Sequence, residues 1–549
     1  MAASKSMITK FFWVTLIVSL LIIARELNPF DGLMFIGHDE TQAARVLEFS
    51  FNIQNGIIPP RIAPHFSFNL GYPIFNYYAP TAYWITSLLH LTGMGVSQAL
   101  ELSFILALGI GGIGMFFFLN KYFDKHAGLI GALSYISSPF IATEIFVRSN
   151  LAEMWFFALF PLTLYLLSTI SNRWVFLTAM VLSFLLTSHN IFSLVVIPIL
   201  LLYAFILKER KVWYAILGGV ALSLYFWFPA VLELSQVHAQ NVATLTKYAD
   251  HFLCPLQLWS SPWGYGGSIP GCIGDGMSFM IGKTQMMLSI AGIFLFIAHF
   301  NKSKIKINNL LGLLVGLIFI GSIFLTTSYS TIIWETFSPL LSLFQFPWRF
   351  LLFVIFGASF FTAYFVFTLP RMLKIVSASF LIFALLFMNS KFFVANSLPI
   401  SSFTNQYTSN KYIEESAAYK VSEYLPISAD YKLWKSIEET DTEKYGFENN
   451  IDNPFHRSIS SNSTEEILLN IHSAPYWKIS VDGTQYHPDS FDGFGRPILK
   501  FPSKIHQSIE IIYRQTPMQY VGNIMTILTS IILLLYSYQE SLWKKKTKH

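Results

Sequence analysis

Three consecutive ionisable residues, His38, Asp39 and Glu40, follow the first long apolar run of the sequence. A carboxylate in this position could act as a general base toward a sugar hydroxyl or could hold a metal ion. The alternative is structural, because Asp39 would also suit the N-cap of a helix from Glu40 to Phe51. The pattern leaves both interpretations open.

A second group of charges, Glu144, Arg148 and Glu153, lies where two apolar runs meet. A charge at mid-membrane depth costs about 2.5 to 3.5 kcal/mol, so such residues usually face a cavity or a partner. Arg148 and Glu153 could pair with each other. In the alternative interpretation Arg148 binds a phosphate and Glu153 orients a donor or an acceptor, and the spacing does not decide between the two.

Two further polar residues, His189 and Arg349, interrupt apolar sequence on the same predicted side. His189 suits either a hydrogen-bonded turn or a functional group. Arg349 ends the motif Gln-Phe-Pro-Trp-Arg and suits either interfacial anchoring or contact with a phosphate. If these residues share one site, Asp39, Arg148, Glu153 and His189 should converge on one outward-facing cavity.

Aromatic residues and the two cysteines mark the remaining outer sequence. Tyr77, Tyr78 and Trp263 are candidate substrate-binding residues, and the glycine-rich sequence around Trp263 suits either stacking against sugar faces or a plain irregular loop. Cys254 and Cys272 could close a disulfide, worth about 3 kcal/mol in the loop-entropy model, or could be unrelated thiols. The sequence contains no Walker A loop, no dinucleotide glycine fingerprint, no paired Cys-x-x-Cys and no His-Glu-x-x-His motif, which disfavours a nucleotide-driven pump and a zinc hydrolase.

Composition indicates what kind of body must position these residues. Of the 549 residues, 53% are hydrophobic and only 12% are charged, about half the charged fraction of an ordinary soluble domain. A soluble enzyme is therefore excluded and a polytopic membrane protein is predicted. The net charge of +5 does not indicate a nucleic-acid partner, because the basic residues sort by membrane side.

Twelve apolar runs are long enough to be predicted as spans. They lie near residues 11–24, 98–119, 128–146, 151–170, 174–190, 191–207, 212–230, 285–300, 308–328, 350–369, 375–390 and 518–537. Alternating spans place the basic clusters near Lys121, Arg210 and Arg371 on the cytoplasmic side with both termini, as the positive-inside rule requires. The run from Tyr83 to Leu91 is about half a span long and is predicted to be an interfacial helix on the outer face.

Three segments, 25–97, 231–284 and 391–517, remain on the outer side. The last is polar and alternates with a period of two, broken by Asp482-Gly483 and Asp492-Gly493, which indicates an antiparallel β domain. The predicted fold is thus mainly α and polytopic. It consists of a membrane body at 1–390, a sandwich-like β domain at 391–517, and a last span with a basic cytoplasmic tail at 518–549.

The order of these motifs resembles one family. From Gly37 to Gly483 the chain carries the acidic first-loop motif, Gly-Tyr-Pro and Tyr-Tyr-x-Pro segments, the short interfacial helix, an Arg and a Glu near the fourth span, Ser-His-Asn, Phe-Pro-Trp-Arg and Tyr-Trp-Lys-Ile-Ser-Val-Asp-Gly. This order resembles the bacterial membrane proteins labelled 6-pyruvoyl-tetrahydropterin synthase-related, which in turn look like the GT-C superfamily of polytopic glycosyltransferases. A pterin synthase activity is not expected, because the soluble enzyme needs a compact zinc site of histidines and the histidines here are scattered.

The GT-C resemblance implies an inverting transfer of a sugar from a polyprenyl-phosphate donor to an envelope glycan, lipid or protein acceptor. It assigns Asp39, with its neighbour Glu40, as the base or acceptor-positioning group and Glu153 as a second acidic position. Arg148 and Arg349 would hold the donor phosphate, and His38 and His189 join the substrate-binding candidates. A divalent metal ion, if the reaction uses one, would lie at Asp39 and Glu153.

The expected setting is the bacterial inner membrane, with membrane lipid, a polyprenyl-phosphate sugar donor and a glycan or lipid acceptor as partners. One alternative is a transporter or flippase for a lipid-linked glycan, whose buried charges line a path. Another is a non-catalytic envelope assembly protein in which Asp39 only caps a helix. The ionisable candidates gather at the outer ends of spans, which favours the enzyme.

Overall fold

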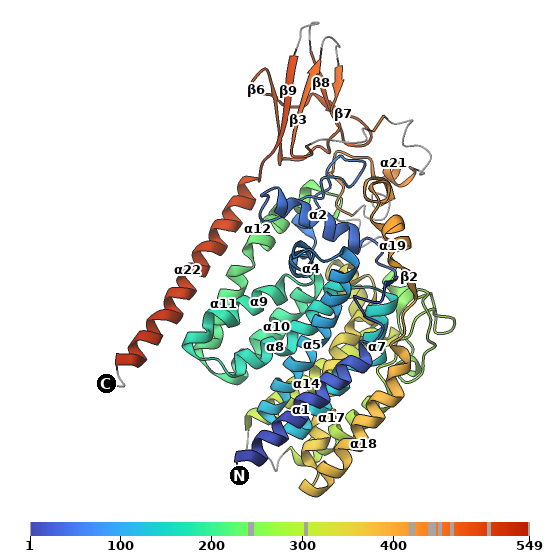
Figure 1. The fold of residues 1–549 in the computed structure, drawn as a ribbon, viewed down its shortest axis with the longest axis vertical. Helices are drawn as coiled ribbons and strands as arrows, with labels where there is room; N and C mark the ends of the chain where they lie inside the picture. Colours follow the sequence, from blue (N-terminus) through green and yellow to red (C-terminus); the bar gives the residue numbers. More distant parts are fainter. Residues whose placement is uncertain are drawn as a thin grey trace.

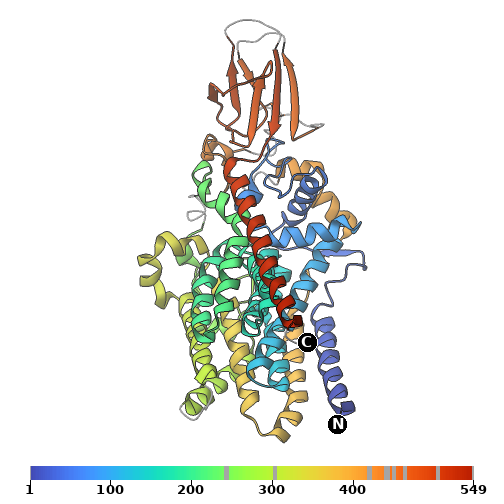
Figure 2. The same cartoon turned by 90° about the vertical axis from the view of Figure 1, so that its left-hand side faces the viewer.

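Long apolar helices form one end of the molecule and β-strands form the other (Figure 1). The computed structural model describes residues 2–239, 246–300, 306–416, 423–437, 446–447, 453–461, 466–501 and 507–546. The start of α1 and the end of α22 both lie toward the end remote from the strands (Figure 2). This is the arrangement expected if both termini lie on one side of a membrane.

Seven helices in the described part of the chain are long and apolar enough to cross a membrane alone. They are α5 (Val96–Tyr122), α8 (Leu151–Ser168), α10 (Asn190–Leu207), α14 (Lys306–Thr326), α17 (Leu351–Thr368), α18 (Arg371–Asn389) and α22 (Pro517–Lys546). Two bent pairs raise this number to nine if each pair is one span. They are α6 (Lys125–Ile136) with α7 (Pro139–Ala142) and the π-helix η1 (Thr143–Val147), bent by 44°, and α11 (Arg210–Leu222) with α12 (Leu224–Leu232), bent by 55°.

The remaining three predicted spans form shorter apolar helices. They are Phe12–Ile23 within α1 (Ala2–Ile23), Asn172–Leu186 including α9 (Val175–Leu186), and α13 (Lys283–His299). Each is shorter than the ~20 residues that cross a bilayer without tilt or thinning. A mainly helical polytopic body is therefore confirmed, with seven to nine candidate spans among the described residues, and the number twelve stays a prediction.

Short helices of the first outer loop lie between the bundle and the strands (Figure 1). They are α2 (Gln42–Gln54), α3 (Ile74–Tyr77) and α4 (Thr81–Leu91). α4 has nearly the bounds predicted for the interfacial helix, and its buried face is polar. Thr86 donates to the Ser103 hydroxyl of α5 at 2.8 Å, and Ser87 donates to the Val46 carbonyl of α2 at 3.2 Å. These bonds fix α2, α4 and the outer end of α5 relative to one another.

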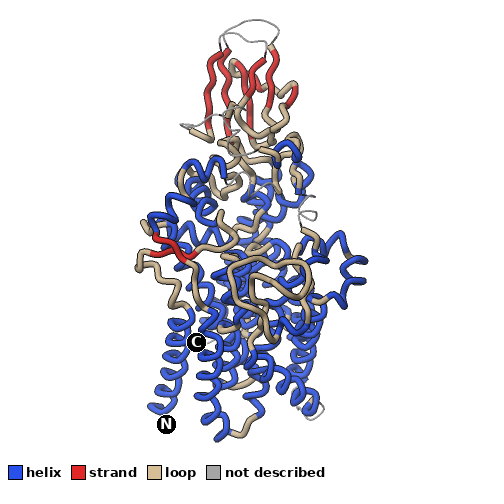
Figure 3. Tube along the Cα trace, turned by 90° about the vertical axis from the view of Figure 1, so that its right-hand side faces the viewer, coloured by secondary structure: helices blue, strands red, loops and turns tan. Residues whose placement is uncertain are grey.

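The C-terminal strands form two antiparallel sheets, drawn in red at one end of Figure 3. Their orders are β3-β9-β5-β6 and β4-β8-β7. The strands are β3 (His456–Ser461), β4 (Glu466–Leu468), β5 (Trp477–Val481), β6 (Thr484–Gln485), β7 (Ser490–Phe491), β8 (Pro497–Lys500) and β9 (Gln507–Tyr513). Asp482 and Gly483 join β5 to β6 with φ of +48° and +78°, the left-handed pair that favours Asp-Gly in two-residue hairpins. The predicted small β region is confirmed.

Other outer segments connect these layers. A two-stranded sheet of β1 (Leu33–Phe35) and β2 (Ser397–Pro399) joins the first loop to the segment after α18, and α19 (Ile400–Tyr407) and α21 (Tyr431–Lys435) follow. The short helices α15 (Thr331–Thr336) and α16 (Ser338–Leu341) precede α17. The last helix, α22, returns from the strands along α11 and α12 (Figure 1).

Candidate active site

A break between two apolar helices brings the second predicted group of charges together. The π-helix η1 ends at Val147, Ser149 has a φ of +52°, and the Asn150 side chain caps α8 by accepting from the Glu153 backbone N–H at 3.0 Å. π-bulges of this kind are frequent at functional sites. The reversal places Arg148 between a carboxylate of η1 and a carboxylate in the first turn of α8.

Arg148 is bound by carboxylates on both sides. Its Nη1 lies 2.5 Å from both oxygens of Glu144, and its Nη2 donates to Glu153 Oε1 at 2.9 Å. Both carboxylates are fully buried, and the guanidinium lies 4.5 Å from the centre of the Trp348 ring. The pairing of Arg148 with Glu153, one of the two interpretations of the sequence, is therefore present.

Glu153 Oε1 is the point where several predicted site residues meet. Besides Arg148, Asn150 donates to it at 2.8 Å, Arg349 Nε lies 3.1 Å away without hydrogen-bond alignment, and His189 Nε2 lies 3.7 Å away. Glu153 Oε2 is buried with no hydrogen-bond partner among the described residues. The cluster thus leaves one carboxylate oxygen free to accept a further donor.

His189 is also a turn residue, because it caps α10. Its Nδ1 accepts from the Phe192 backbone N–H at 3.4 Å, which leaves the proton on Nε2, the nitrogen that faces Glu153. Burial above all, assisted by Arg349 and Arg148 and opposed by Glu153, lowers the pKa of His189 to about 3. The imidazole is therefore a neutral donor at physiological pH.

Asp39 is held against the same helix break by its backbone. The His38 N–H donates to the Val147 carbonyl at 2.8 Å, and the Asp39 N–H donates to the Arg148 carbonyl at 3.1 Å. A Cβ on Gly37 would lie 2.2 Å from the Ser149 hydroxyl oxygen, so this close approach requires glycine. The first loop is thereby fixed directly beside the buried charges.

The Asp39 side chain does not cap a helix. Thr41 is the N-cap of α2, and the Asp39 carboxylate accepts from Thr41 Oγ1 at 3.1 Å and from Gln42 Nε2 at 2.5 Å. The N-cap interpretation of Asp39 is therefore wrong, because α2 begins at Gln42, two residues later than the sequence predicts. Arg45 Nη1 lies 3.6 Å from the same carboxylate.

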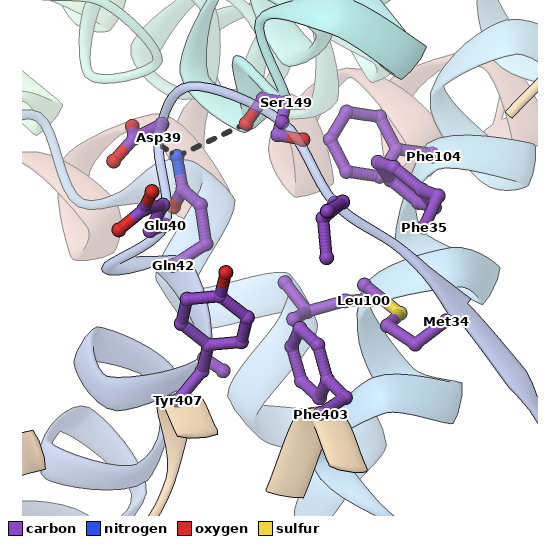
Figure 4. A pocket seen from close by; sticks show the side chains of 13 residues that line it. Met34, Phe35, Asp39, Glu40, Gln42, Leu100, Phe104, Ser149, Phe403 and Tyr407 are labelled. Atoms are coloured by element: carbon purple, nitrogen blue, oxygen red, sulfur yellow. Dashed lines mark hydrogen bonds between the residues drawn. The ribbon is translucent and has the colours of Figure 1, made fainter. Parts of the chain in front are cut away.

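Asp39 and Glu40 line a small pocket (Figure 4). Its volume is about 20 Å³, room for about one water molecule. Figure 4 shows the two carboxylates at one end and the rings of Phe35, Phe104 and Phe403 around the other. In this conformation the pocket does not hold a sugar.

A larger cavity, of about 370 Å³, lies on the other side of Arg45. Four residues predicted to bind substrate line it: Tyr77, Tyr78, His189 and Arg349. The lining also contains three residues that the sequence did not suggest for this role: Arg45, Glu423 and Tyr424. We call this space the arginine cavity.

Two guanidinium groups reach the arginine cavity, while the carboxylates that pair with them do not line it. Arg45 donates to the Tyr83 hydroxyl at 3.0 Å and lies 4.9 Å from the centre of the Tyr78 ring. Arg349 Nη1 donates to the Phe344 carbonyl at 2.8 Å and to Gln345 Oε1 at 3.2 Å. Each guanidinium is thus held in one orientation before any ligand arrives.

Part of the lining of the arginine cavity is apolar and exposed. It contains Leu194 of α10, Val231 of α12 and Leu234, whose exposed fractions are 43%, 60% and 45%. Helices α10 and α12 both belong to candidate spans. In a bilayer these side chains would meet acyl chains, so the cavity joins a lipid-facing wall to fixed cationic groups.

The expected convergence is therefore partial. His189 lines the arginine cavity, Arg148 and Glu153 lie behind it in the buried cluster, and Asp39 lies beside it in the small pocket. Arg45 connects Asp39 to the arginine cavity, because it lies beside the Asp39 carboxylate and also lines the cavity. No sequence pattern points to Glu423 or Tyr424, because they approach Arg45 and Tyr77 only through tertiary contacts across more than 340 residues of chain.

His38 and Trp263 lie away from the arginine cavity. His38 Nε2 is 3.1 Å from the Tyr265 carbonyl, and the Trp263 ring packs against Tyr265 and Phe392. These contacts attach the middle outer loop to the first loop. In the same loop Cys254 and Cys272 form a disulfide with their Cα atoms 5.7 Å apart.

A divalent metal fits the predicted carboxylate pair poorly. No group of three or more His, Cys, Asp and Glu side chains in the described ranges is placed to hold a metal ion. Glu153 Oε1 is surrounded by nitrogen donors, and the Asp39 carboxylate accepts from Thr41 and Gln42. These donors occupy Glu153 Oε1 and both oxygens of Asp39, and Glu153 Oε2 is the one oxygen of the pair without a partner among the described residues.

Comparison with known proteins identifies no family for the chain. No protein-family model matches it, and no curated protein is similar in sequence. Some solved structures are similar over part of its length. The Archaeoglobus fulgidus oligosaccharyltransferase in its apo form is 14% identical with a TM-score of 0.41, and the match covers 70% of this chain and 55% of that one.

ArnT from Cupriavidus metallidurans is 16% identical with a TM-score of 0.39, over 67% of this chain and 62% of ArnT. A mycobacterial arabinofuranosyltransferase, AftD, is 16% identical with a TM-score of 0.36, over 70% of this chain and 27% of AftD. The chain thus spans less than two thirds of each of these proteins. Similarities of this size do not identify an activity.

Proposed function

We propose that this chain is an integral-membrane glycosyltransferase that moves a sugar from a polyprenyl-phosphate donor to an envelope glycan, lipid or protein on the outer face. One observation carries the proposal. The arginine cavity combines a lipid-accessible apolar wall with two preoriented guanidinium groups, which is the chemistry needed to hold a lipid phosphate. We propose that the chain has a GT-C-like fold and lies in the inner membrane of a bacterium. Both termini would then be cytoplasmic.

In the proposed reaction the donor's polyprenyl chain lies against Leu194, Val231 and Leu234, and its phosphate meets Arg45 and Arg349. An acceptor oxygen attacks the anomeric carbon with inversion while the bond to the phosphate oxygen breaks. The guanidinium groups stabilise the charge that develops on the departing polyprenyl phosphate. Glu153 lies against Arg349 and orients it.

A carboxylate must accept the proton of the attacking hydroxyl. Asp39 is the candidate that the sequence predicts, and Glu40 is its neighbour in the small pocket. Tyr77 and Tyr78 offer aromatic faces to the sugar. Arg148, sequestered between Glu144 and Glu153, is proposed to hold Glu153 in place instead of contacting phosphate.

The experiment that tests the proposal is mass spectrometry of lipids and envelope glycans from a strain that lacks the gene. We expect one sugar to be missing from the glycan and a polyprenyl-phosphate sugar to accumulate, and both changes to be reversed by the wild-type gene. A complete glycan trapped on the cytoplasmic side would indicate a flippase instead. Unchanged lipids and glycans would contradict both activities.

A further inference from the structure

Glu423 is the one carboxylate among the described residues that line the arginine cavity. It comes from the outer segment that follows α18, far in sequence from the helices that form the rest of the lining. The three carboxylates that the sequence singled out as catalytic candidates, Asp39, Glu40 and Glu153, do not line this space. Glu153 is fully buried behind Arg349, and Asp39 lines the small pocket.

The chain around Glu423 is fixed by contacts with two other outer segments, one containing Tyr72 and Tyr77 and one containing Val237 and His238. The Tyr424 N–H donates to the Tyr72 hydroxyl at 2.7 Å, and the Tyr424 ring stacks on Tyr77 with centroids 5.4 Å apart. The Leu425 carbonyl accepts from the His238 N–H at 2.9 Å. A short antiparallel bridge between Val237 and Pro426 continues this contact. The contacts of the residues that follow Glu423, and not contacts of its own side chain, therefore hold Glu423 at the cavity.

The surroundings of Glu423 suit a group that takes up a proton. Burial raises the pKa of Glu423 above its usual value, and Arg45 and Lys435 oppose that rise. A general base works best when its pKa lies closer to the working pH than that of a free carboxylate. Arg45 also lines the cavity and is close enough to act on the charge of Glu423, and the donor phosphate is proposed to bind at this guanidinium.

We propose that Glu423 is the general base of the transfer reaction and that it positions the acceptor hydroxyl in the arginine cavity, an inference that rests on the proposed function. The acceptor O–H proton passes to the Glu423 carboxylate while the acceptor oxygen forms the bond to the anomeric carbon. The bond from that carbon to the phosphate oxygen breaks, and its electron pair leaves with the polyprenyl phosphate. The proton is later lost to solvent, and no other reactant is needed.

Asp39 then has a different role, as a positioning residue for Arg45. Its carboxylate lies 3.6 Å from Arg45 Nη1 and is held by Thr41 and Gln42. The small pocket that it lines has room for about one water molecule, whereas the arginine cavity is large enough for a sugar ring. The two assignments, Glu423 or Asp39 as base, predict different results for matched variants.

The test uses membranes from the deletion strain, which on the proposed function contain both accumulated donor and unmodified acceptor. Purified full-length protein is added in detergent, and the rate of sugar transfer is followed by mass spectrometry. The variants are Glu423→Gln, Glu423→Ala and Asp39→Ala. Glu466→Gln, on the exposed strand β4 and outside the arginine cavity, is the matched control.

We expect Glu423→Gln to lower the transfer rate by about 10²-fold or more, the usual contribution of a general base, and Glu466→Gln to leave it unchanged. Added formate should restore part of the rate to Glu423→Ala, because a small carboxylate can occupy the space and accept the proton, and should not restore Asp39→Ala. A wild-type rate for Glu423→Gln, or rescue of Asp39→Ala alone, would overturn the assignment. Absence of transfer by the wild-type protein would instead count against the proposed function, and the base assignment would fall with it.

Discussion

Replacing Arg349 by Gln should weaken the binding of a polyprenyl phosphate without unfolding the protein. Arg349 is held in place by the Phe344 carbonyl and by Gln345, so it offers the phosphate a preoriented donor. A charge-assisted hydrogen bond contributes about 1.5 to 3 kcal/mol, which corresponds to a loss of roughly 10- to 150-fold in affinity. The affinity of Arg349→Lys for polyprenyl phosphate should lie between those of the wild type and Arg349→Gln, because lysine keeps the charge and loses the forked geometry.

The assay is binding of undecaprenyl phosphate to purified full-length protein in detergent, measured as the ligand-dependent rise in melting temperature. The control is Arg173→Gln, which removes the same charge at an exposed position where the guanidinium contacts only the Trp174 ring among the interactions described. Wild-type affinity in Arg349→Gln would refute the assignment of the phosphate site to the arginine cavity. An equal loss of affinity in Arg349→Gln and Arg173→Gln would show that the effect comes from net charge and not from a phosphate site at Arg349.

Three further predictions concern the scaffold of the site. Gly37→Ala should lower the melting temperature and the transfer rate together, because the added methyl would collide with the loop at 147–149, whereas Gly267→Ala, with nothing within 4 Å, should change neither. Arg148→Met should destabilise the protein by about 3 to 5 kcal/mol in denaturant titrations, because it leaves two buried carboxylates without their shared partner; a loss below 1 kcal/mol would contradict this. Burial lowers the pKa of His65, but the charge and the hydrogen bond of Glu48 outweigh burial, so the net effect is a raised pKa. The His65–Glu48 pair therefore stabilises the fold below about pH 6.5, and this stabilisation is lost as the pH rises through the folded-state pKa of His65. His65→Gln should therefore lower the melting temperature more at pH 5.5 than at pH 8.5, and an equal effect at both would refute the pairing.

The helices and some of the strands could be predicted because their signal is local. Each predicted span coincides with an apolar helix or a bent pair of helices, and the alternation at Trp477–Val481 corresponds to β5. The strand β3 (His456–Ser461) was missed, since Arg-Ser-Ile-Ser-Ser has little apolar alternation and is held mainly by pairing with β9. Where helices are short or bent, their length does not distinguish a membrane span from a buried helix, so the sequence does not determine the number of spans.

The site could be predicted only in part, because its geometry depends on contacts between distant segments. The charges of Arg148 and Glu153 were evident, but the left-handed turn at Ser149 that joins them was not. Asp39 appeared as a free carboxylate or a helix cap, and the structure shows it bound to Gln42 beside Arg45. No pattern in the sequence indicates which outer segment reaches the arginine cavity.

The proposed function is tested most directly by counting the polyprenyl phosphate released per sugar transferred when purified protein is added to membranes of the deletion strain. We predict one polyprenyl phosphate for each sugar that appears on the acceptor, with the anomeric configuration inverted relative to the donor. Movement of an intact lipid-linked sugar across the bilayer without release of polyprenyl phosphate would contradict the account.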